Sequence, residues 1–167
     1  SHESRENMIG YEESNGNQYR FGMPGTPLKE AAWKACLQAV ININDIGVIV
    51  ASGSLPPGVP LNIYAQLAKI AKNKGAKFVV DTSGEALKEA AEEGVYLLKP
   101  NLGELCTLAG KTALMPGERK EVAKDIIAAG KCEVLVISMG AEGAMLVTNN
   151  LAEIITAPKV VRKSTVG

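Results

Sequence analysis

The sequence predicts an α/β fold with a mostly parallel sheet, and three observations support this prediction. Short apolar runs of the length of strands alternate with amphipathic segments of about ten to fifteen residues, which is the length of helices. Such alternation indicates right-handed βαβ units. Alanine, valine, isoleucine and leucine are plentiful whereas aromatic residues make up only 4%, which suits buried strands covered by alanine-rich helices. The 167 residues also match the length of one ordinary domain.

The first segment differs from the rest and predicts a β-hairpin. Two short extended stretches, Asn7–Tyr11 and Gln18–Gly22, flank the sequence EESNGN. Within it, the Asn15-Gly16 pair is a strong signal for a hairpin turn. Since an isolated hairpin is only marginally stable in water, we expect it to pair with another segment or to lie across a partner.

The remaining elements follow in order. A helix is predicted over residues 28–44, where apolar residues recur at helical spacing: Leu28, Ala32, Ala35, Cys36 and Ala39. The run GVIVA, residues 47–51, predicts a buried strand, and the LPPG that follows breaks it. A second amphipathic helix is predicted over residues 61–75, with Gly75 as its C-cap. Its inner face contains Ile63, Leu67 and Ile70.

Three further strands and three further helices complete the predicted core. The strands come from apolar runs, at residues 77–81, 95–99 and 132–140. The helices come from amphipathic runs, at residues 83–94, from 101 onward, and 117–130. Ser83 opens the first of these helices and Gly94 closes it. Two last stretches form a predicted antiparallel pair, at residues 143–150 and 152–157.

Composition argues against several classes of protein. Basic and acidic residues balance at 18 each and the pI is about 6.6. No strong electrostatic case therefore exists for binding nucleic acid or an anionic membrane. No apolar run approaches the roughly 18–20 residues of a membrane span, and we expect no signal peptide before the start. We therefore expect a soluble, cytoplasmic protein.

Residues that commonly carry nucleophilic or metal chemistry are few. His2 is the single histidine, which argues against a Ser-His-Asp hydrolase or a zinc enzyme. The three cysteines, Cys36, Cys106 and Cys132, lie far apart and form no metal-ligand pair such as C-x-x-C. Their odd number argues against a closed set of disulfides, and we expect reduced, buried thiols.

The candidate site is the set of loops that follow the strands, because ligands of parallel sheets bind there. Four such loops occur, SGSLPPG, DTSGE, KPNLGE and SMGAEGA. In KPNLGE, Asn101 suits a helix N-cap and Glu104 suits the third position of a capping box. The same atoms suit a second role, since Lys99 and the Asn101 amide can face phosphate oxygens and Glu104 can bind Mg²⁺ through water. Spacing alone favours the cap, and the two interpretations are compatible.

Two other loops have weaker signals and two interpretations each. SGSLPPG places Ser52 and Ser54 either in a tight turn or where their hydroxyls meet a sugar or phosphate. SMGAEGA, with Ser138, Gly140 and Gly143, is either a turn that needs positive φ or a backbone that a nucleotide phosphate can approach. It matches neither a Walker A loop nor the dinucleotide pattern G-x-G-x-x-G.

Three charged residues near these loops are also open to two interpretations. Asp81 ends a strand, where an aspartate is more often a turn acceptor or N-cap than a catalytic group. Arg5 and Arg20 flank the hairpin and are either solvated or placed to grip a phosphate, which guanidinium binds through two hydrogen bonds.

Seven segments, taken in order, resemble the ribokinase-like (PfkB-type) sugar kinases. They are SRENM, NQYRFGMPG, ASGSLPPGVP, VVDTSGEAL, LLKPNLGEL, VISMGAEGA and KSTVG. Each segment is moderately specific, but their common order from Arg5 to Gly167 makes a strong match. The branch that the chain resembles most contains the ATP-dependent phosphofructokinases. Its neighbours act on fructose 1-phosphate and tagatose 6-phosphate.

The resemblance implies a three-layer α/β/α fold with a mostly parallel sheet and a small β lid. Residues 1–24 correspond to part of the lid, and residues 25–167 to part of the core. In the phosphofructokinase branch the lid also pairs subunits, which implies a homodimer. The implied reaction transfers the γ-phosphoryl group of Mg·ATP to a hydroxyl of a sugar phosphate, foremost fructose 6-phosphate to fructose 1,6-bisphosphate. A 1-phosphofructokinase or a tagatose-6-phosphate kinase is the alternative.

The resemblance also implies roles for individual residues. Arg5 and Ser54 correspond to residues that bind the sugar phosphate, and Glu104 to the residue that serves the magnesium. The residues that correspond to the nucleotide site are Lys99, Asn101, Ser138, Gly140, Gly143 and Ser164. ATP and Mg²⁺ are thus the implied cofactors.

The sequence departs from the family pattern at both ends. The family begins with a further segment of strands, lid and glycine-rich sugar site, and it continues past STVG with alanine, glycine and the aspartate that acts as general base. No catalytic residue is therefore assigned up to Gly167. Because phosphoryl transfer depends on positioning and electrostatic stabilisation, we expect these residues alone to be inactive as a kinase.

The sequence is also compatible with two other functions. The first is a non-catalytic module that binds nucleotide or dimerises through the lid, which the missing aspartate favours. The second is a nucleotide-binding oxidoreductase, against which the missing dinucleotide glycine pattern argues.

Overall fold

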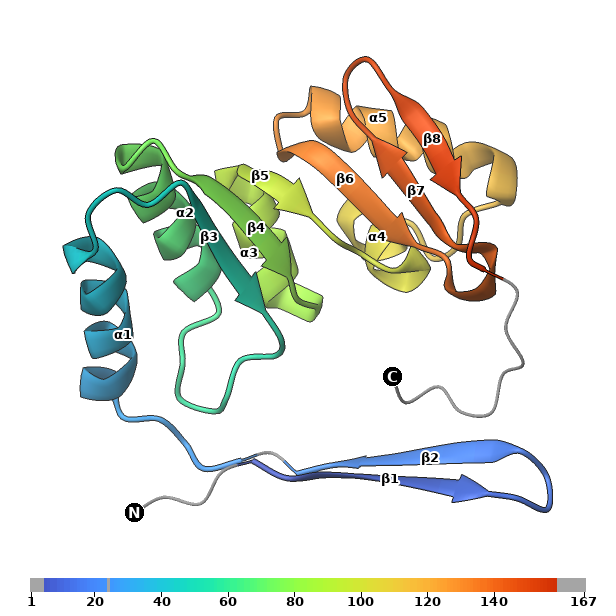
Figure 1. The fold of residues 1–167 in the computed structure, drawn as a ribbon, viewed down its shortest axis with the longest axis horizontal. Coiled ribbons are helices and arrows are strands. Elements are labelled where there is room, and N and C mark those ends of the chain that lie inside the picture. Colours follow the sequence, from blue (N-terminus) through green and yellow to red (C-terminus); the bar gives the residue numbers. More distant parts are fainter. Residues whose placement is uncertain (1–4, 24, 159–167) are drawn as a thin grey trace.

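A computed structural model describes residues 5–23 and 25–158, which form two sheets (Figure 1). The smaller sheet is the hairpin of β1 (Asn7–Glu12) and β2 (Asn17–Gly22). The larger sheet has its strands in sequential order: β3 (Val48–Ser52), β4 (Lys77–Asp81), β5 (Val95–Leu98), β6 (Cys132–Ser138), β7 (Ala144–Val147) and β8 (Ala152–Ile155). Strands β3 to β6 are parallel, and β7 and β8 add as antiparallel neighbours. The predicted hairpin, parallel sheet and final antiparallel pair are confirmed.

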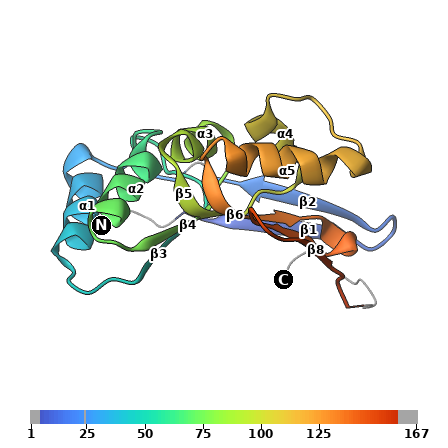
Figure 2. The same cartoon turned by 90° about the horizontal axis from the view of Figure 1, so that it is seen from above.

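The helices in the described residues lie side by side on one face of the larger sheet (Figure 2). They are α1 (Glu30–Asn42), α2 (Ile63–Asn73), α3 (Gly84–Glu93), α4 (Leu102–Ala109) and α5 (Arg119–Ala128). Two 3₁₀ turns, η1 (Pro116–Glu118) and η2 (Gly140–Glu142), precede α5 and β7. None of the helices in residues 5–23 and 25–158 is both long and apolar enough to cross a membrane.

Helices α2 to α5 share one face because of the order of the strands that they connect. Each parallel strand is added on the same side of the one before it, and right-handed crossovers then place every connecting helix on the same face. Of the two helical layers that the three-layer prediction requires, the described residues therefore supply one. A second helical layer, on the other face of the sheet, requires connecting helices that lead to strands on the far side of β3.

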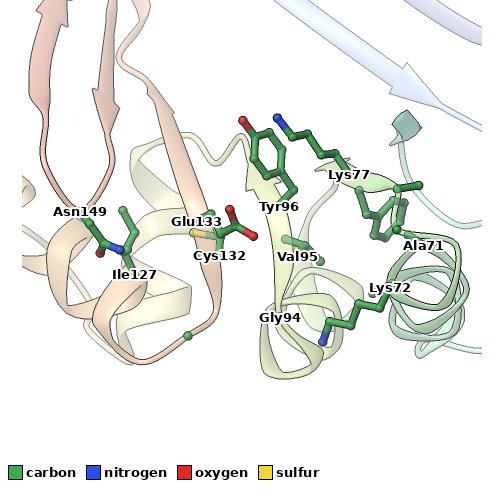
Figure 3. Close-up of a pocket in the computed structure, with 15 residues that line it drawn as sticks. Ala71, Lys72, Lys77, Gly94, Val95, Tyr96, Ile127, Cys132, Glu133 and Asn149 are labelled. Carbon is green, nitrogen blue, oxygen red and sulfur yellow. The ribbon is translucent and has the colours of Figure 1, made fainter. Parts of the chain in front are cut away.

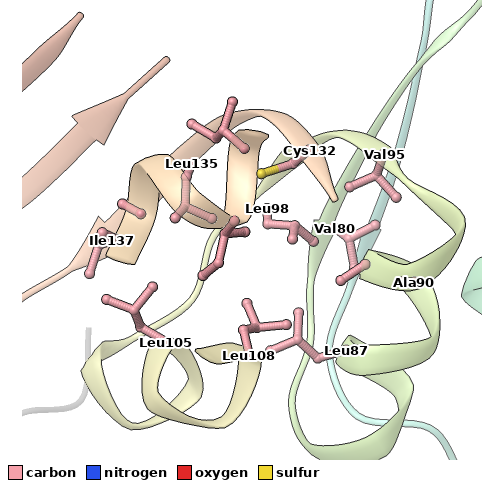
Figure 4. Close-up of a cluster of buried hydrophobic side chains, with 14 of the residues drawn as sticks. Val80, Leu87, Ala90, Val95, Leu98, Leu105, Leu108, Cys132, Leu135 and Ile137 are labelled. Carbon is pink, nitrogen blue, oxygen red and sulfur yellow. The ribbon is translucent and has the colours of Figure 1, made fainter. Parts of the chain in front are cut away.

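The core lies between the helices and the sheet (Figure 4). Its centre is a row of three residues in register across β4, β5 and β6, namely Val80, Leu98 and Leu135, each 0% exposed. Leu87 of α3 and Leu105 of α4 are buried against the same cluster. Burial of an aliphatic side chain stabilises by roughly 1.5–3 kcal/mol. Because a one-residue slip would turn this row outward, the row specifies the register of the parallel strands.

The opposite face of the sheet carries a second apolar row. In register across the parallel strands it consists of Val50, Val79, Leu97 and Val134. Val50 is 66% exposed, and no helix of the described part of the chain covers this face (Figure 2). In that part of the chain β3 is also an edge strand with one unpaired side. Both features are typical of a sheet that continues into, or packs against, further structure.

Helix α1 turns a different face inward from the predicted one. Trp33 and Leu37 pack against the core, whereas Ala32, Ala35 and Cys36 of the predicted stripe are exposed. Both stripes recur at helical spacing, so the periodicity is ambiguous. The larger side chains bury more apolar surface and therefore decide which stripe faces the core.

The cysteines differ in their surroundings. Cys36 is exposed, Cys106 is half-buried and Cys132 is buried, so the prediction of three buried thiols is wrong for Cys36, which shares the outer stripe of α1. Burial in the core raises the pKa of the Cys132 thiol to about 12. That thiol therefore stays protonated at neutral pH and acts as a small apolar side chain.

Candidate functional site

The predicted site residues that the structure describes gather at the carboxyl edge of the six-stranded sheet. The loops that follow β3, β4, β5 and β6 all leave the sheet at this edge, because the strands are parallel. The β1–β2 hairpin lies beyond the same edge (Figure 1). A ligand at this edge would thus be bordered by the strand-end loops and by the hairpin.

One contact joins the start of the hairpin to the sheet. The guanidinium Nη1 of Arg5 donates a hydrogen bond of 2.6 Å to the hydroxyl oxygen of Ser54. The two residues are 49 positions apart, and the family resemblance implies that both bind the sugar phosphate. Gly25, with φ +75°, lies against Arg5, since a Cβ atom there would be 3.4 Å from the Arg5 Cβ. The structure thus brings together the two residues predicted to bind substrate.

The peptide of Gly53 holds Ser54 in place. The Gly53 N–H donates to the backbone oxygen of Asp81 at 2.8 Å. The Gly53 carbonyl accepts hydrogen bonds from the hydroxyls of Tyr64 at 3.0 Å and of Thr82 at 2.9 Å. Burial raises the pKa of the Tyr64 phenol, which keeps it protonated and able to donate. The loop after β3 is therefore anchored from α2 and from β4.

Asp81 connects the two halves of the site. Its carboxylate accepts a hydrogen bond of 3.3 Å from Ser52 and pairs with the Lys99 ammonium at 3.1 Å. The side chains of Lys99 and Asp81 are 44% and 37% exposed, so the pair contributes at most about 1 kcal/mol to stability. A lysine held this weakly can turn to a phosphate without a large loss.

Asn101 and Glu104 form the predicted capping box of α4. The Asn101 side chain accepts from the Glu104 N–H at 2.9 Å, and the Glu104 carboxylate accepts from the Asn101 N–H at 2.8 Å. In the described part of the chain these bonds use only Oε2 of Glu104. Its other oxygen can meet a ligand while the cap stays intact, so the structural and functional interpretations of this motif coexist.

The loop from Ser138 to Gly143 lies next to the segment after β5. The Ser138 N–H donates to the Pro100 carbonyl at 2.9 Å, and Asn101 forms an isolated parallel bridge with Ser138. The Met139 N–H donates to the Gly143 carbonyl at 2.8 Å, which closes the loop. Both glycines of this loop, Gly140 and Gly143, have positive φ, at +62° and +98°.

The two glycines of this loop have different surroundings. A Cβ atom on Gly143 would lie 2.0 Å from the carbonyl oxygen of Ile155 at the end of β8, whereas a Cβ on Gly140 would meet nothing within 4 Å. Gly143 is therefore required for the packing of β7 on β8. Gly140 leaves open space at the surface, which suits the predicted approach of a phosphate to the backbone.

The structure thus places most predicted residues but not all of them. It joins Arg5 to Ser54, Asn101 to Glu104, and Lys99 to Asp81, for which the sequence suggested only a turn or cap. Ser164 lies outside the described residues. Sequence reasoning missed Tyr64 and Thr82. Tyr64 had a weak signal, since it follows the predicted inner residue Ile63 and combines an apolar ring with a polar tip.

A cavity of about 420 Å³ opens at the opposite, amino edge of the sheet (Figure 3). Lys72 lies in its wall, donates to the Glu93 carbonyl and pairs with the Glu93 carboxylate at 3.4 Å. This lysine therefore stabilises the end of α3. The Nζ of Lys77 lies 4.3 Å from the centre of the Tyr96 ring. None of the predicted site residues within 5–23 and 25–158 lines this cavity, and we place the site at the carboxyl edge.

Comparison with known proteins decides the family. Residues 5–167 match the family model described as pfkB family carbohydrate kinase. The chain belongs to the PfkB family. The resemblance that the seven segments predicted is confirmed.

Three individual proteins match the chain over most of its length. The ATP-dependent 6-phosphofructokinase isozyme 2 of Escherichia coli K12 is 38% identical over 165 residues, which cover 98% of this chain and 53% of that protein. The 1-phosphofructokinase of Bacillus subtilis is 30% identical over 144 residues, which cover 86% and 47%. The crystal structure of Escherichia coli phosphofructokinase-2 in complex with fructose-6-phosphate superimposes with a TM-score of 0.86 at 36% identity, over 95% of this chain and 52% of that one.

These matches show which fold the chain has and how much of its relatives it covers. The structural likeness confirms the predicted ribokinase-like α/β fold. The chain spans about half the length of the curated relatives it matches. Membership of the PfkB family is therefore established for the chain.

The two loop glycines provide a test of this geometry by substitution. We expect Gly143→Ala to lower the free energy of unfolding by at least about 2 kcal/mol, because the new methyl group meets backbone atoms and φ is positive. Gly140→Ala is the matched control, with an expected loss of about 1 kcal/mol from φ alone. Urea unfolding of both variants measures the difference. Equal losses would show that Gly143 is not packed as described.

Proposed function

We propose that this chain carries the sugar-phosphate and Mg·ATP binding residues of a kinase. Residues 1–24 act as part of a lid and residues 25–167 as part of the core. The kinase transfers the γ-phosphoryl group of ATP to a hydroxyl of a sugar phosphate. In that step the bond from the γ-phosphorus to the ADP oxygen breaks, a bond to the sugar oxygen forms, and the hydroxyl proton passes to a base. The family pattern places this base beyond Gly167.

The observation that carries the proposal is the division of the carboxyl edge into two halves. Arg5 and Ser54 present a cation and a hydroxyl on one side, as a sugar phosphate requires. Lys99 and the Asn101–Glu104 pair present a cation, an amide and a carboxylate on the other side, as Mg·ATP requires. Asp81 contacts both sides, through Gly53 and through Lys99.

Fructose 6-phosphate is the proposed acceptor. The 6-phosphofructokinase isozyme 2 of Escherichia coli supports this choice, since it is 38% identical over 98% of the chain. The relatives named 1-phosphofructokinase match less of the chain, at 30% identity over 86% and 39% identity over 69%. They keep fructose 1-phosphate as the alternative acceptor, with tagatose 6-phosphate behind it. We expect the 167 residues alone to show no turnover, so ligand binding is the property to measure.

The residues present fit a magnesium ion that arrives with the nucleotide. The described residues contain no group of three or more histidine, cysteine or acidic side chains that could hold a metal. Mg²⁺ needs no such cage, since it keeps several waters and is held by one or two carboxylates together with phosphates. The oxygen of Glu104 that the cap does not use would supply one such carboxylate contact. When bound, the ion neutralises charge that develops on the transferring phosphoryl group.

A homodimer through the hairpin is part of the proposal. In β1 and β2, Met8 and Phe21 are direct cross-strand partners that are 63% and 54% exposed. Tyr11 and Tyr19 are also about half exposed. A two-stranded hairpin with so many exposed apolar side chains is not stable by itself, and pairing with a second copy would cover them.

Substitution of Arg5 tests the sugar-phosphate half. Arg5→Ala is expected to raise the Kd for fructose 6-phosphate about 10- to 100-fold, because one charge-assisted contact to phosphate is lost. The Kd for Mg·ATP should change less than about twofold. Isothermal titration with each ligand measures both constants. An equal rise in both, or no rise for the sugar phosphate, would remove Arg5 from this role.

Substitution of Glu104 separates its two roles. Glu104→Gln keeps a side-chain acceptor for the capping box, so the free energy of unfolding should change by less than about 0.5 kcal/mol. The Mg²⁺-dependent gain in ATP affinity should fall about tenfold, since the carboxylate charge is lost. Glu104→Ala is the control that also loses the cap, at about 1 kcal/mol. Unaltered Mg²⁺ dependence in Glu104→Gln would contradict a metal role.

Substitution of Phe21 tests the hairpin interface. Phe21→Asp introduces a charge into the proposed contact, and sedimentation velocity should show a shift from dimer to monomer. Met115→Asp is the matched control, because Met115 is 70% exposed on the α4–α5 connection. It should leave the dimer intact. A dimer that survives Phe21→Asp, or a parent chain that is monomeric, would overturn the proposed interface.

A further inference from the structure

Arg119, the first residue of α5, makes contacts that the assigned site does not explain. Its guanidinium Nη1 donates to the Glu142 carboxylate at 3.0 Å and lies 3.6 Å from the Met139 sulfur. The Arg119 side chain is only 12% exposed. In the described part of the chain its Nε–H is buried and has no hydrogen-bond partner. A cation so poorly solvated depends on its single carboxylate partner.

Both contacts of Arg119 fall in the loop predicted to hold the nucleotide. Met139 immediately follows Ser138, and Glu142 ends the η2 turn directly before Gly143. Among the described residues the turn is otherwise closed by its own backbone, through hydrogen bonds of 3.3 Å from Glu142 to Met139, 3.1 Å from Gly143 to Gly140 and 2.8 Å from Met139 to Gly143. The hydrogen-bond geometry of short 3₁₀ turns is poorer than that of an α-helix. The ion pair therefore adds a restraint on this short turn from a residue outside it.

The position of Arg119 lets its ion pair with Glu142 restrain the turn effectively. Helix α5 runs antiparallel to the strand β6 that follows it, so the start of α5 lies at the carboxyl edge beside the loop. Helix α5 is firmly packed, since Val122, Ala123 and Ile126 are buried in the core. A side chain on its first residue therefore connects the loop to a rigid support.

We propose that Arg119 is a positioning residue of the nucleotide site. It holds the turn Gly140–Glu142 in the conformation that presents the Ser138–Gly143 backbone to the phosphates of a nucleoside triphosphate. The inference rests on the proposed function and adds to it a residue that touches no ligand. Its contribution is preorganisation, because a loop that is already ordered loses less conformational entropy when ATP binds.

The test compares single and double substitutions of the ion pair. The variants are Arg119→Met, Glu142→Gln and their combination, with Lys124→Met as a control that removes an exposed charge from the same helix. Hydrogen exchange measures opening of residues 140–144, and titration measures Kd for Mg·ATP and for fructose 6-phosphate. If Arg119→Met fails to fold, Glu142→Gln tests the same pair from its exposed partner, whose side chain is 62% exposed.

We expect faster exchange at residues 140–144 in both single variants and a rise of about three- to tenfold in the Kd for Mg·ATP. The Kd for fructose 6-phosphate should not change, and the double variant should resemble Arg119→Met, because the two side chains act as one unit. Lys124→Met should match the parent chain in every measurement.

Three results would overturn the inference. Unchanged exchange in both single variants would show that the pair does not hold the turn. Faster exchange with an unchanged Kd for Mg·ATP would show that the turn does not serve the nucleotide. A parent chain that binds no Mg·ATP would contradict the proposed function, and the nucleotide role of Arg119 with it, whatever the exchange shows.

Discussion

The register of the parallel sheet is the constraint on which the candidate site depends. Val80, Leu98 and Leu135 align across three strands and are fully buried. The residues that follow Val80 and Leu98 are Asp81 and Lys99, which leave the sheet at neighbouring positions and meet at 3.1 Å. Burial of the row contributes several kcal/mol, whereas the exposed ion pair contributes at most about 1 kcal/mol. The core therefore decides where the charged residues of the site meet.

Several residues of the site stabilise the fold whether or not a ligand is bound. Asn101 and Glu104 cap α4 while one carboxylate oxygen stays available. The Gly53 carbonyl, which accepts two side-chain hydroxyls, fixes the residue before Ser54. Because these groups are already held, binding would need little reorganisation, and this is the condition under which electrostatic stabilisation of phosphoryl transfer is effective.

The two exposed apolar surfaces have different physical origins. The hairpin exposes side chains such as Met8 and Phe21 because two strands alone have no second layer to cover them. The sheet exposes Val50 because crossovers in one direction place helices α2 to α5 on the other face. Proteins of the PfkB family that match this chain are about twice as long.

The sequence by itself determined the local elements. Alternating apolar runs and amphipathic segments located the strands and helices, Asn15-Gly16 located the hairpin turn, and the spacing of Asn101 and Glu104 located a capping box. Each of these depends on interactions between residues close in the chain, for which spacing is sufficient information. The order of the strand-end motifs also indicated the family, since each motif is itself a local pattern.

Only the tertiary structure decided which distant residues meet. Arg5 reaches Ser54 across 49 positions, Lys99 pairs with Asp81, and Arg119 holds Glu142. The inward face of α1 was likewise decided by packing, because two stripes of the helix have the same period and only the larger side chains of one fill the space beside α2. These contacts depend on strand order, crossover direction and side-chain volume, which act between segments far apart in the chain and leave no periodic signal within any one of them.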